Sequence, residues 1–348
     1  MGLGDVYKRQ GCCPTGKMII LGIETSCDET AVSVCRNGEI LSNTVSSQLI
    51  HNSYGGVVPE IASREHEKLL NIVVDKSLGE AGINLADVDA VAVTQGPGLA
   101  GTLLTGISFA KGLAMGLNIP LIPVNHLEAH IFANFLVDPT LEYPFVCLLV
   151  SGGHTQLWHI KNMDSYTLLG ETRDDAAGEA FDKGARILGL GYPGGPAIET
   201  TAIGGNPDAI HFPRGLMGNA SLEFSYSGLK TSLLYFMDDF KENVSISKND
   251  VAASYQQAIV DSLVEKMNRA VYQTKSKTCV IAGGVAANKT LRICSREKLA
   301  NIRILFPDLS FCTDNGAMVS FLGEVKLNAG YITNIEFDAQ PNLKMATS

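Results

Sequence analysis

Residues 18–45 read MIILGIETSCDETAVSVCRNGEILSNTV, and this stretch decides the fold class. Its apolar runs, separated by polar turns, predict strands at residues 19–23, 31–34 and 40–45. The Asn-Gly pair at residues 37–38 lies between the second and third runs, where it is a strong signal for an antiparallel hairpin. We therefore expect the fold to open with three antiparallel strands.

Helices and strands alternate after this opening, and the same order then occurs a second time. In the first copy we expect helices at 61–78 and 102–117, strands at 88–94 and 119–124, and a helix that starts near His126. The second copy is predicted to contain strands at 145–150, 155–160, 166–169, 278–282 and 302–306, and helices at 174–188, 286–295 and from about 315. This order predicts an α/β protein of two similar lobes facing a cleft, with ligands at turns where strands meet helices.

The lobes are assigned to residues 18–130 with 307–348 and to residues 131–306. Residues 1–17 show no periodicity, so we interpret them as a non-native leader and Met18 as the start. No apolar run approaches a membrane span, and eight cysteines without a C-x-x-C spacing suit reduced thiols, so we expect a soluble cytoplasmic protein. The net charge of −9 argues against a broadly basic surface for nucleic acid.

The segment NHLEAH, residues 125–130, contains a candidate pair of metal ligands. In a helix, His126 and His130 share one face with Cβ atoms roughly 5–6 Å apart, close enough to bind one ion. The alternative is two ordinary hydrogen-bonded histidines. A metalloprotease of the H-E-x-x-H type is disfavoured, because Glu128 follows His126 by two positions and points about 200° around the helix, away from both imidazoles.

A third ligand is available in CTDNGAM, residues 312–318, where Asp314 stands at the start of the last predicted helix. Two histidines and one carboxylate leave coordination positions open for a substrate, and this set suits Fe(II) or Zn²⁺. The alternative is that Asp314 only caps the helix.

Two Gly-rich turns favour a nucleotide site. In LVSGGHT, residues 149–155, Gly152 and Gly153 leave backbone N–H groups open to an anion or a carbonyl oxygen. In AGGVAAN, residues 282–288, the turn opens a helix whose N-terminus favours phosphate, although Asn288 could simply cap that helix. A third turn, GPGLAG at residues 96–101, fits G-x-G-x-x-G, but Pro97 removes one N–H, so we interpret it as a tight strand-to-helix turn.

The predicted helix at 174–188 contains Gly178 and Gly184, which indicates that another group approaches it closely. Asp182 in this helix could bind a ligand hydroxyl or pair with Arg186. Cys27 lies in a turn without an identifiable base, so a packed thiol is favoured over a nucleophile.

Taken together, ten motifs in this order resemble one family, the bacterial-type tRNA N6-adenosine threonylcarbamoyltransferases (TsaD). The motifs are GIETSCDET (22–30), YGGVVPEIASREH (54–66), GPGLAG (96–101), NHLEAH (125–130), VSGGHT (150–155), DDAAGEAFDK (174–183), YPGGP (192–196), FSYSGLKT (224–231), AGGVAAN (282–288) and CTDNGAM (312–318). The resemblance implies an actin-like fold of the sugar kinase and Hsp70 superfamily, with two duplicated RNase H-like lobes around a cleft.

The resemblance also implies a reaction: transfer of threonylcarbamoyl from threonylcarbamoyl-AMP to N6 of the adenosine next to the anticodon in tRNAs reading ANN codons, which forms t6A and AMP. It implies one divalent metal ion, Fe(II) or alternatively Zn²⁺, on His126, His130 and Asp314. The substrate-binding positions it implies are Leu149, Val150, Ser151, Gly152, Gly153, Asp182, Gly195, Glu199 and Asn288. No catalytic acid or base is assigned.

The implied partners are tRNA and proteins of the TsaB and TsaE type. Because the chain is acidic overall, we expect Arg214 and Lys230 to contact tRNA phosphate locally while partner proteins supply more positive surface. The alternatives are a non-catalytic scaffold of the same fold, a metalloprotease, and a sugar or acetate kinase that shares the fold.

Overall fold

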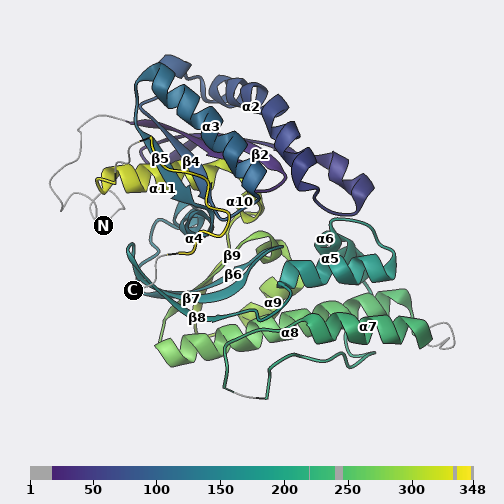
Figure 1. Ribbon diagram of the computed structural model, residues 1–348. Coiled ribbons are helices and arrows are strands. Elements are labelled where there is room, and N and C mark those ends of the chain that lie inside the picture. Colours follow the sequence, from purple (N-terminus) through teal and green to yellow (C-terminus); the bar gives the residue numbers. More distant parts are fainter. Residues whose placement is uncertain (1–17, 219, 240–245, 332–334, 346–348) are drawn as a thin grey trace. The chain divides into compact units, whose positions relative to one another are not determined.

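The computed structural model describes residues 18–218, 220–239, 246–331 and 335–345, and the predicted leader, residues 1–17, lies outside them (Figure 1). The chain divides into two compact units. Unit 1 comprises Met1–Leu141 and Asp308–Met345, and unit 2 comprises Glu142–Pro307 and Ala346–Ser348. The first boundary lies after residue 141 instead of 130, because the histidine-bearing helix α4 (His126–Val137) continues past residue 130 and packs against α11 (Gly316–Asn328) of the same unit.

Unit 1 contains a five-stranded sheet in the order β3-β2-β1-β4-β5. The three predicted opening strands are confirmed as antiparallel neighbours, and the remaining two pair in parallel. The strands are β1 (Ile19–Glu24), β2 (Glu29–Arg36), β3 (Glu39–Ser47), β4 (Ala90–Gly96) and β5 (Leu121–Asn125).

Successive residues of a strand point to opposite faces of the sheet, and β1 shows how both faces of this sheet are covered. Leu21 and Ile23 belong to a buried apolar cluster with residues of α2 (Pro59–Ala81) and α3 (Ala100–Leu117). Gly22 faces the other way, where a Cβ would lie 2.4 Å from the backbone nitrogen of Ser320 in α11. The sheet of unit 1 is therefore buried between helices on both faces. Short elements complete the unit: η1 (Leu49–Tyr54), η2 (Leu85–Asp87) and α10 (Leu309–Cys312).

Unit 2 repeats the strand order of unit 1. Its sheet runs β10-β9-β6-β7-β8. Read from β8, it has two antiparallel pairs followed by two parallel pairs, as unit 1 has when read from β3. The predicted duplication is thereby confirmed for the strands, whereas the helices between β8 and β9 include α6, α7 and α8, which the sequence analysis did not predict. The strands are β6 (Phe145–Val150), β7 (Thr155–Asn162), β8 (Ser165–Glu171), β9 (Thr278–Ala282) and β10 (Arg303–Leu305). The helices are α5 (Ala177–Leu188), α6 (Gly194–Thr201), α7 (Ser227–Asp239), α8 (Lys248–Thr274), η4 (Gly284–Ala287) and α9 (Lys289–Lys298).

Two predicted helices in unit 2 start later than expected because side chains hold the preceding backbone outside the helix. The carboxylate of Asp174 accepts hydrogen bonds from the backbone N–H of Tyr226 at 2.7 Å and from the hydroxyl of Ser225 at 2.6 Å, so α5 begins at Ala177 and not at residue 174. The helix predicted at 286–295 splits at Asn288, whose side chain caps α9.

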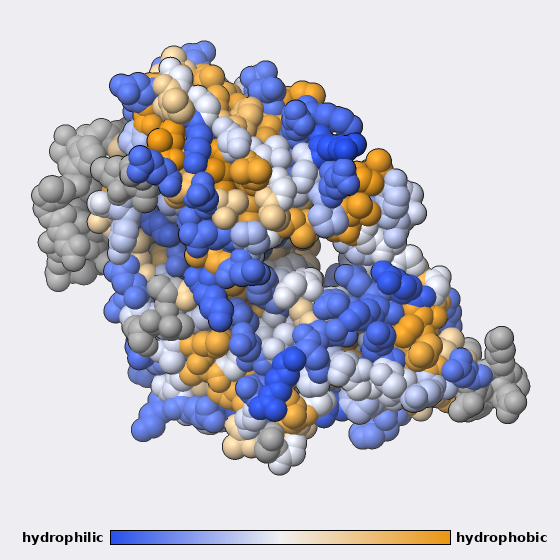
Figure 2. Space-filling model, in the orientation of Figure 1, coloured by the Kyte–Doolittle hydropathy of each residue, from blue (hydrophilic) through white to orange (hydrophobic). Residues whose placement is uncertain are grey.

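Helix α3 has the length and apolar composition of a membrane-crossing helix. Its residues Leu103, Ile107 and Ala110 nevertheless pack into the core of unit 1, against the sheet and α2, as in a globular domain. The face shown in Figure 2 carries apolar side chains over α2 and α3. Large exposed apolar residues of these two helices are Ile72, Leu104 and Met115.

Candidate functional site

The predicted histidine pair lies on the first turns of α4, directly after β5. Asn125 ends the strand and caps the helix, because its side-chain oxygen accepts hydrogen bonds from the backbone N–H of Leu127 at 2.9 Å and of Glu128 at 3.3 Å. The ring centroids of His126 and His130 are 4.7 Å apart. The prediction that a helix brings both imidazoles to one face is confirmed.

Asp314 meets both histidines, although it is 184 residues from His130 in the chain. Its Oδ1 lies 3.1 Å from Nε2 of His130 and 3.5 Å from Nε2 of His126. One ligand atom from each of the three residues lies within 4.8 Å of the others. The alternative that Asp314 only caps the last helix is wrong, because Asn315 is the cap of α11 and accepts the N–H of Met318 at 3.0 Å.

Two residues that the sequence analysis missed orient His126. Its Nδ1 lies 3.1 Å from Oε2 of Glu24, which is fully buried, and 3.2 Å from Oγ of Ser26. A carboxylate on the far nitrogen of a metal-binding imidazole fixes the ring orientation, and here it turns Nε2 toward Asp314. The available signal was a glutamate that ends the buried strand β1.

The charges around the three residues favour a bound cation. Burial lowers the pKa of His126, but the carboxylates of Asp314 and Glu24 raise it, so that it reaches about 9. Burial, together with the carboxylates of Asp314 and Asp28, raises the pKa of Glu29 to about 9. Several acids thus gather around two imidazoles. Nδ1 of His130 is buried without a hydrogen-bond partner among the described residues. A donor set of two imidazole nitrogens and one carboxylate suits a divalent transition metal.

Glu128 has no part in this centre. Its Oε2 lies 2.9 Å from Nζ of Lys326, which is on α11. The predicted orientation away from both imidazoles is confirmed, and the zinc-protease arrangement, which needs a glutamate beside the ion, does not form.

The Ser151 turn, the first predicted part of the nucleotide site, connects β6 to β7 in unit 2. Leu149 and Val150 are fully buried, so only their backbone groups could meet a ligand. The N–H of Ser151 donates to the carbonyl of His154 at 2.8 Å, so in this turn the N–H of Ser151 is engaged within the protein. Gly152 and Gly153 are exposed, and a Cβ on either would meet open space.

The other predicted substrate-binding residues are brought together around this turn, all within unit 2. Oδ1 of Asp182 in α5 accepts a hydrogen bond from the N–H of Gly194 at 2.7 Å. Gly194 is the first residue of α6 and precedes Gly195. Oε1 of Glu199 in α6 accepts the N–H of Lys289 at 2.6 Å, the first residue of α9. Asn288 is buried, and its amide accepts the N–H of Leu291 at 2.9 Å and donates to Gln256 at 2.8 Å.

Close backbone approach joins these parts into a ring. The N–H of Gly178 in α5 donates to the carbonyl of Ser151 at 3.1 Å. Gly283, with φ of +90°, passes β6 so closely that a Cβ would lie 2.5 Å from the carbonyl oxygen of Val150. The prediction of close approach to the helix at 174–188 is also confirmed at Gly184, where a Cβ would lie 2.4 Å from the ring of Tyr255. The N-termini of α5, α6 and α9 therefore lie in one continuous set of contacts, and the carboxylates of Asp182 and Glu199 already accept the first N–H groups of α6 and α9.

The two remaining sequence motifs have structural roles. In GPGLAG the N–H of Gly98 donates to the carbonyl of Pro341 at 3.1 Å, which confirms the interpretation as a tight turn packed against the chain. Burial and the neighbouring carboxylates of Asp28 and Asp314 raise the pKa of the Cys27 thiol far above its usual range. Cys27 is partly buried, and its raised pKa disfavours the thiolate, in agreement with the interpretation as a packed thiol.

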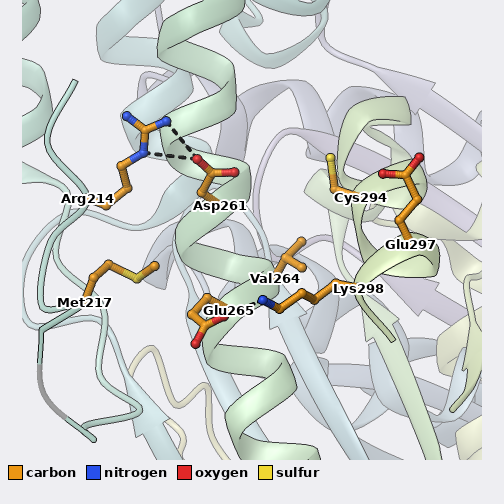
Figure 3. A pocket seen from close by; sticks show the side chains of 8 residues that line it. All are labelled: Arg214, Met217, Asp261, Val264, Glu265, Cys294, Glu297 and Lys298. Carbon is orange, nitrogen blue, oxygen red and sulfur yellow. Dashed lines mark hydrogen bonds and ion pairs between the residues drawn. The ribbon is translucent and has the colours of Figure 1, made fainter. Parts of the chain in front are cut away.

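A cavity of about 690 Å³ lies elsewhere in unit 2, between α8, α9 and the loop that precedes α7 (Figure 3). Four of its charged groups form two ion pairs: Arg214 contacts Oδ2 of Asp261 at 2.8 Å and 3.1 Å, and Lys298 contacts Glu265 at 3.1 Å. Arg214 also donates to the carbonyl of Phe212 at 2.6 Å. Its three nitrogens are thus engaged within the protein, which disagrees with the predicted contact to tRNA phosphate. The lining residues are Arg214, Met217, Asp261, Val264, Glu265, Cys294, Glu297 and Lys298.

Comparison with known proteins identifies the family. A family model described as TsaD, tRNA N6-adenosine threonylcarbamoyltransferase, matches residues 39–321. A protein named tRNA N6-adenosine threonylcarbamoyltransferase from Thermosipho melanesiensis is 53% identical over 331 residues, which cover 94% of this chain and 100% of that protein. The chain belongs to this family. A second member, from Clostridium perfringens, is 49% identical over 334 residues, which cover 94% of this chain and 98% of the relative.

Solved structures of low identity show the fold of this threonylcarbamoyltransferase family member. Component A of (R)-2-hydroxyglutaryl-CoA dehydratase from Acidaminococcus fermentans has a TM-score of 0.55 at 14% identity, covering 90% of this chain and 99% of that one. HypF from T. kodakarensis has a TM-score of 0.62 at 16% identity, covering 90% of this chain and 48% of that one. The expected actin-like α/β fold is confirmed.

Proposed function

We propose that this protein transfers a threonylcarbamoyl group from threonylcarbamoyl-AMP to N6 of the adenosine next to the anticodon in tRNAs reading ANN codons, forming t6A and AMP. The observation that carries this proposal is membership of a family whose relatives at about half identity over nearly the whole chain bear the name of that transferase. The two residue sets described above supply the chemistry that such a transfer requires.

The adenylate part of the donor binds in unit 2. The exposed turn at Gly152 and Gly153 provides backbone N–H donors, which favour the phosphate of an acyl adenylate. Asp182 and Glu199 hold the starts of α6 and α9 in place through their carboxylates. We infer that Asp182, Gly195 and Asn288 surround the nucleoside.

One divalent metal ion, Fe(II) or alternatively Zn²⁺, is held by His126, His130 and Asp314. The geometry that supports this is the set of three ligand atoms within 4.8 Å of one another, with Glu24 orienting one imidazole. When bound to these three residues, such an ion would supply Lewis-acid chemistry. The protein's own contribution is a rigid donor set, since Nδ1 of His126 is held by Glu24 and Ser26 and His130 is buried.

The reaction itself is an acyl transfer with a simple balance. The lone pair of adenosine N6 attacks the carbamoyl carbon of the mixed anhydride, the bond from that carbon to the phosphate oxygen breaks, and AMP leaves with the electron pair while N6 loses a proton. An exocyclic amine is a weak nucleophile, so the donor must be activated and its developing charge must be stabilised. The anticodon-loop adenosine is already single-stranded, so little unpairing energy is needed to present it.

We infer that the protein works in the cytoplasm with partner proteins of the TsaB and TsaE type. A net charge of −9 disfavours binding to the negatively charged phosphates of tRNA, so we expect other chains to supply positive surface. The neighbouring helices α2 and α3 carry exposed apolar side chains, with Ile72 at 63% and Leu104 at 58% exposure, which suits a protein contact.

The direct test is incubation of the full chain with threonylcarbamoyl-AMP, unmodified tRNA and candidate partners, followed by mass spectrometry of the nucleosides. Formation of t6A by the wild type and its loss in Asp182→Ala and His130→Ala supports the proposal. Phosphoryl transfer from ATP to a sugar or acetate without t6A formation would instead indicate a kinase. Chelator-sensitive peptide cleavage would indicate a protease, and binding of partners without any t6A would indicate a scaffold.

A further inference from the structure

The turn between β1 and β2, residues 25–28, sets the position of the groups that orient His126. Ser26 in this turn presents its hydroxyl to Nδ1 of His126 at 3.2 Å. The N–H of Ser26 donates to Oε1 of Glu24 at 2.5 Å, and the other oxygen of Glu24 faces the same Nδ1 at 3.1 Å. A shift of this turn would therefore move both contacts of the imidazole at once.

His66 of α2 holds the far end of the turn. It is fully buried, its Nε2 lies 2.9 Å from the carbonyl oxygen of Cys27, and its Nδ1 lies 2.8 Å from Oγ1 of Thr30. A carbonyl oxygen can only accept, so Nε2 carries the hydrogen, and Nδ1 of the neutral ring accepts from the hydroxyl of Thr30. Burial lowers the pKa of His66, in agreement with a neutral ring.

Each of three successive carbonyls in the turn is bound by a different part of unit 1. The carbonyl of Ser26 accepts the N–H of Leu99 at 2.8 Å, that of Cys27 accepts His66, and that of Asp28 accepts the N–H of Gln48 at 3.2 Å. His66 also contacts the start of β2, through the side chain of Thr30. It thereby fixes the turn relative to the strand that follows it.

We propose that His66 is a positioning residue for the metal centre: it holds the turn at residues 25–28 so that Glu24 and Ser26 keep Nε2 of His126 directed at Asp314. His66 acts through the turn and is not itself a ligand. The proposal rests on the metal ion of the proposed function. Loss of groups that orient a metal ligand typically costs about 10–100-fold in metal affinity, whereas a buried histidine that only stabilises the fold would leave that affinity unchanged.

Two substitutions break this link, and the chain offers matched controls. Thr30→Val removes the hydroxyl that Nδ1 of His66 accepts while keeping the shape of the side chain, and Thr30→Ser retains it. His66→Leu removes both bonds. Ser77→Ala is the control for stability, because Ser77 is also fully buried on α2 and also donates to a carbonyl of β2, that of Val32 at 3.2 Å, but does not contact the turn.

The test adds Co²⁺ as the probe to each metal-free protein. Competition with a chelator gives the dissociation constant of Co²⁺, and the visible d–d absorption reports the geometry of the bound ion. The thermal midpoint of each metal-free protein gives its stability. Thr30→Val and His66→Leu are expected to weaken Co²⁺ binding by about tenfold and to change the absorption, as for loss of an outer partner of a metal ligand. Thr30→Ser is expected to stay within about twofold of the wild type, and Ser77→Ala to lose thermal stability with the same affinity.

Binding of Co²⁺ to Thr30→Val within about twofold of the wild type, with unchanged absorption, would overturn the proposal, as would an equal loss in Ser77→Ala. Thr30→Val decides the result if His66→Leu does not fold. If the wild type binds no Co²⁺, the metal centre of the proposed function fails and this inference fails with it. If the wild type binds Co²⁺ and the variants do so equally, only the role of His66 is refuted.

Discussion

Gly178→Ala probes the contact between α5 and the Ser151 turn. A Cβ at residue 178 would lie 2.6 Å from the carbonyl oxygen of Ser151 and 2.8 Å from the backbone nitrogen of Gly152. Ordinary van der Waals contact begins at 3.4 Å, so the turn or the helix must move by about 0.8 Å. Both partners are backbone, and the N–H of Gly178 also donates to Ser151, so neither can give way as a flexible side chain would.

The expected cost follows from two opposing effects. Overpacking of this kind costs typically about 1–3 kcal/mol, whereas Gly→Ala in a helix gains at most about 1 kcal/mol of propensity. We therefore expect Gly178→Ala to lower the free energy of unfolding by about 1–2 kcal/mol. Because the turn carries the proposed N–H donors, AMP binding is expected to weaken by about tenfold, or about 1.4 kcal/mol.

Urea denaturation and calorimetric titration with AMP measure the two effects. The control is Gly112→Ala in α3, an exposed helical position where a Cβ meets open space, which should raise stability by up to about 1 kcal/mol and leave AMP binding unchanged. If Gly178→Ala is as stable as Gly112→Ala and binds AMP like the wild type, the close approach and the role of the turn are both wrong.

Three further predictions concern unit 1. Asp314→Ala is expected to abolish stoichiometric metal binding, because it removes the carboxylate that contacts both imidazoles. Elemental mass spectrometry measures the metal content, and retention of one ion per chain would contradict this ligand set. The affinity for Co²⁺ is expected to fall by up to about tenfold per pH unit below pH 9, because the raised pKa of His126 leaves a proton that the ion must displace. This proton stabilises the metal-free fold below pH 6.5, and the stabilisation is lost as the pH rises through 9. Equal Co²⁺ affinities at pH 6.5 and pH 8.5 would exclude this proton displacement. Glu128→Gln breaks the ion pair with Lys326 and should lower the free energy of unfolding, measured by urea denaturation, by about 1 kcal/mol or less while t6A formation persists. A loss of t6A formation at retained stability would give Glu128 a role in the chemistry.

The amino-acid sequence determined several features that depend on neighbouring residues. Strand periodicity predicted the order of strands in both units, although the helices α6, α7 and α8 of unit 2 were not predicted. A spacing of four in a helix placed His126 and His130 on one face. The same geometry predicted correctly that Glu128 turns away from the pair. Local rules suffice in these cases because side-chain direction follows from the backbone conformation of a single element.

The tertiary structure decided which distant groups meet. The sequence left open whether Asp314 is a ligand or a cap, and the packing of α11 beside α4 places it against two histidines 184 and 188 positions earlier in the chain. It left open whether Asp182 binds a ligand or Arg186, and the folded chain shows its carboxylate on the start of α6. The physical reason is that contacts between elements depend on how whole faces pack, and no period within one element encodes the partner.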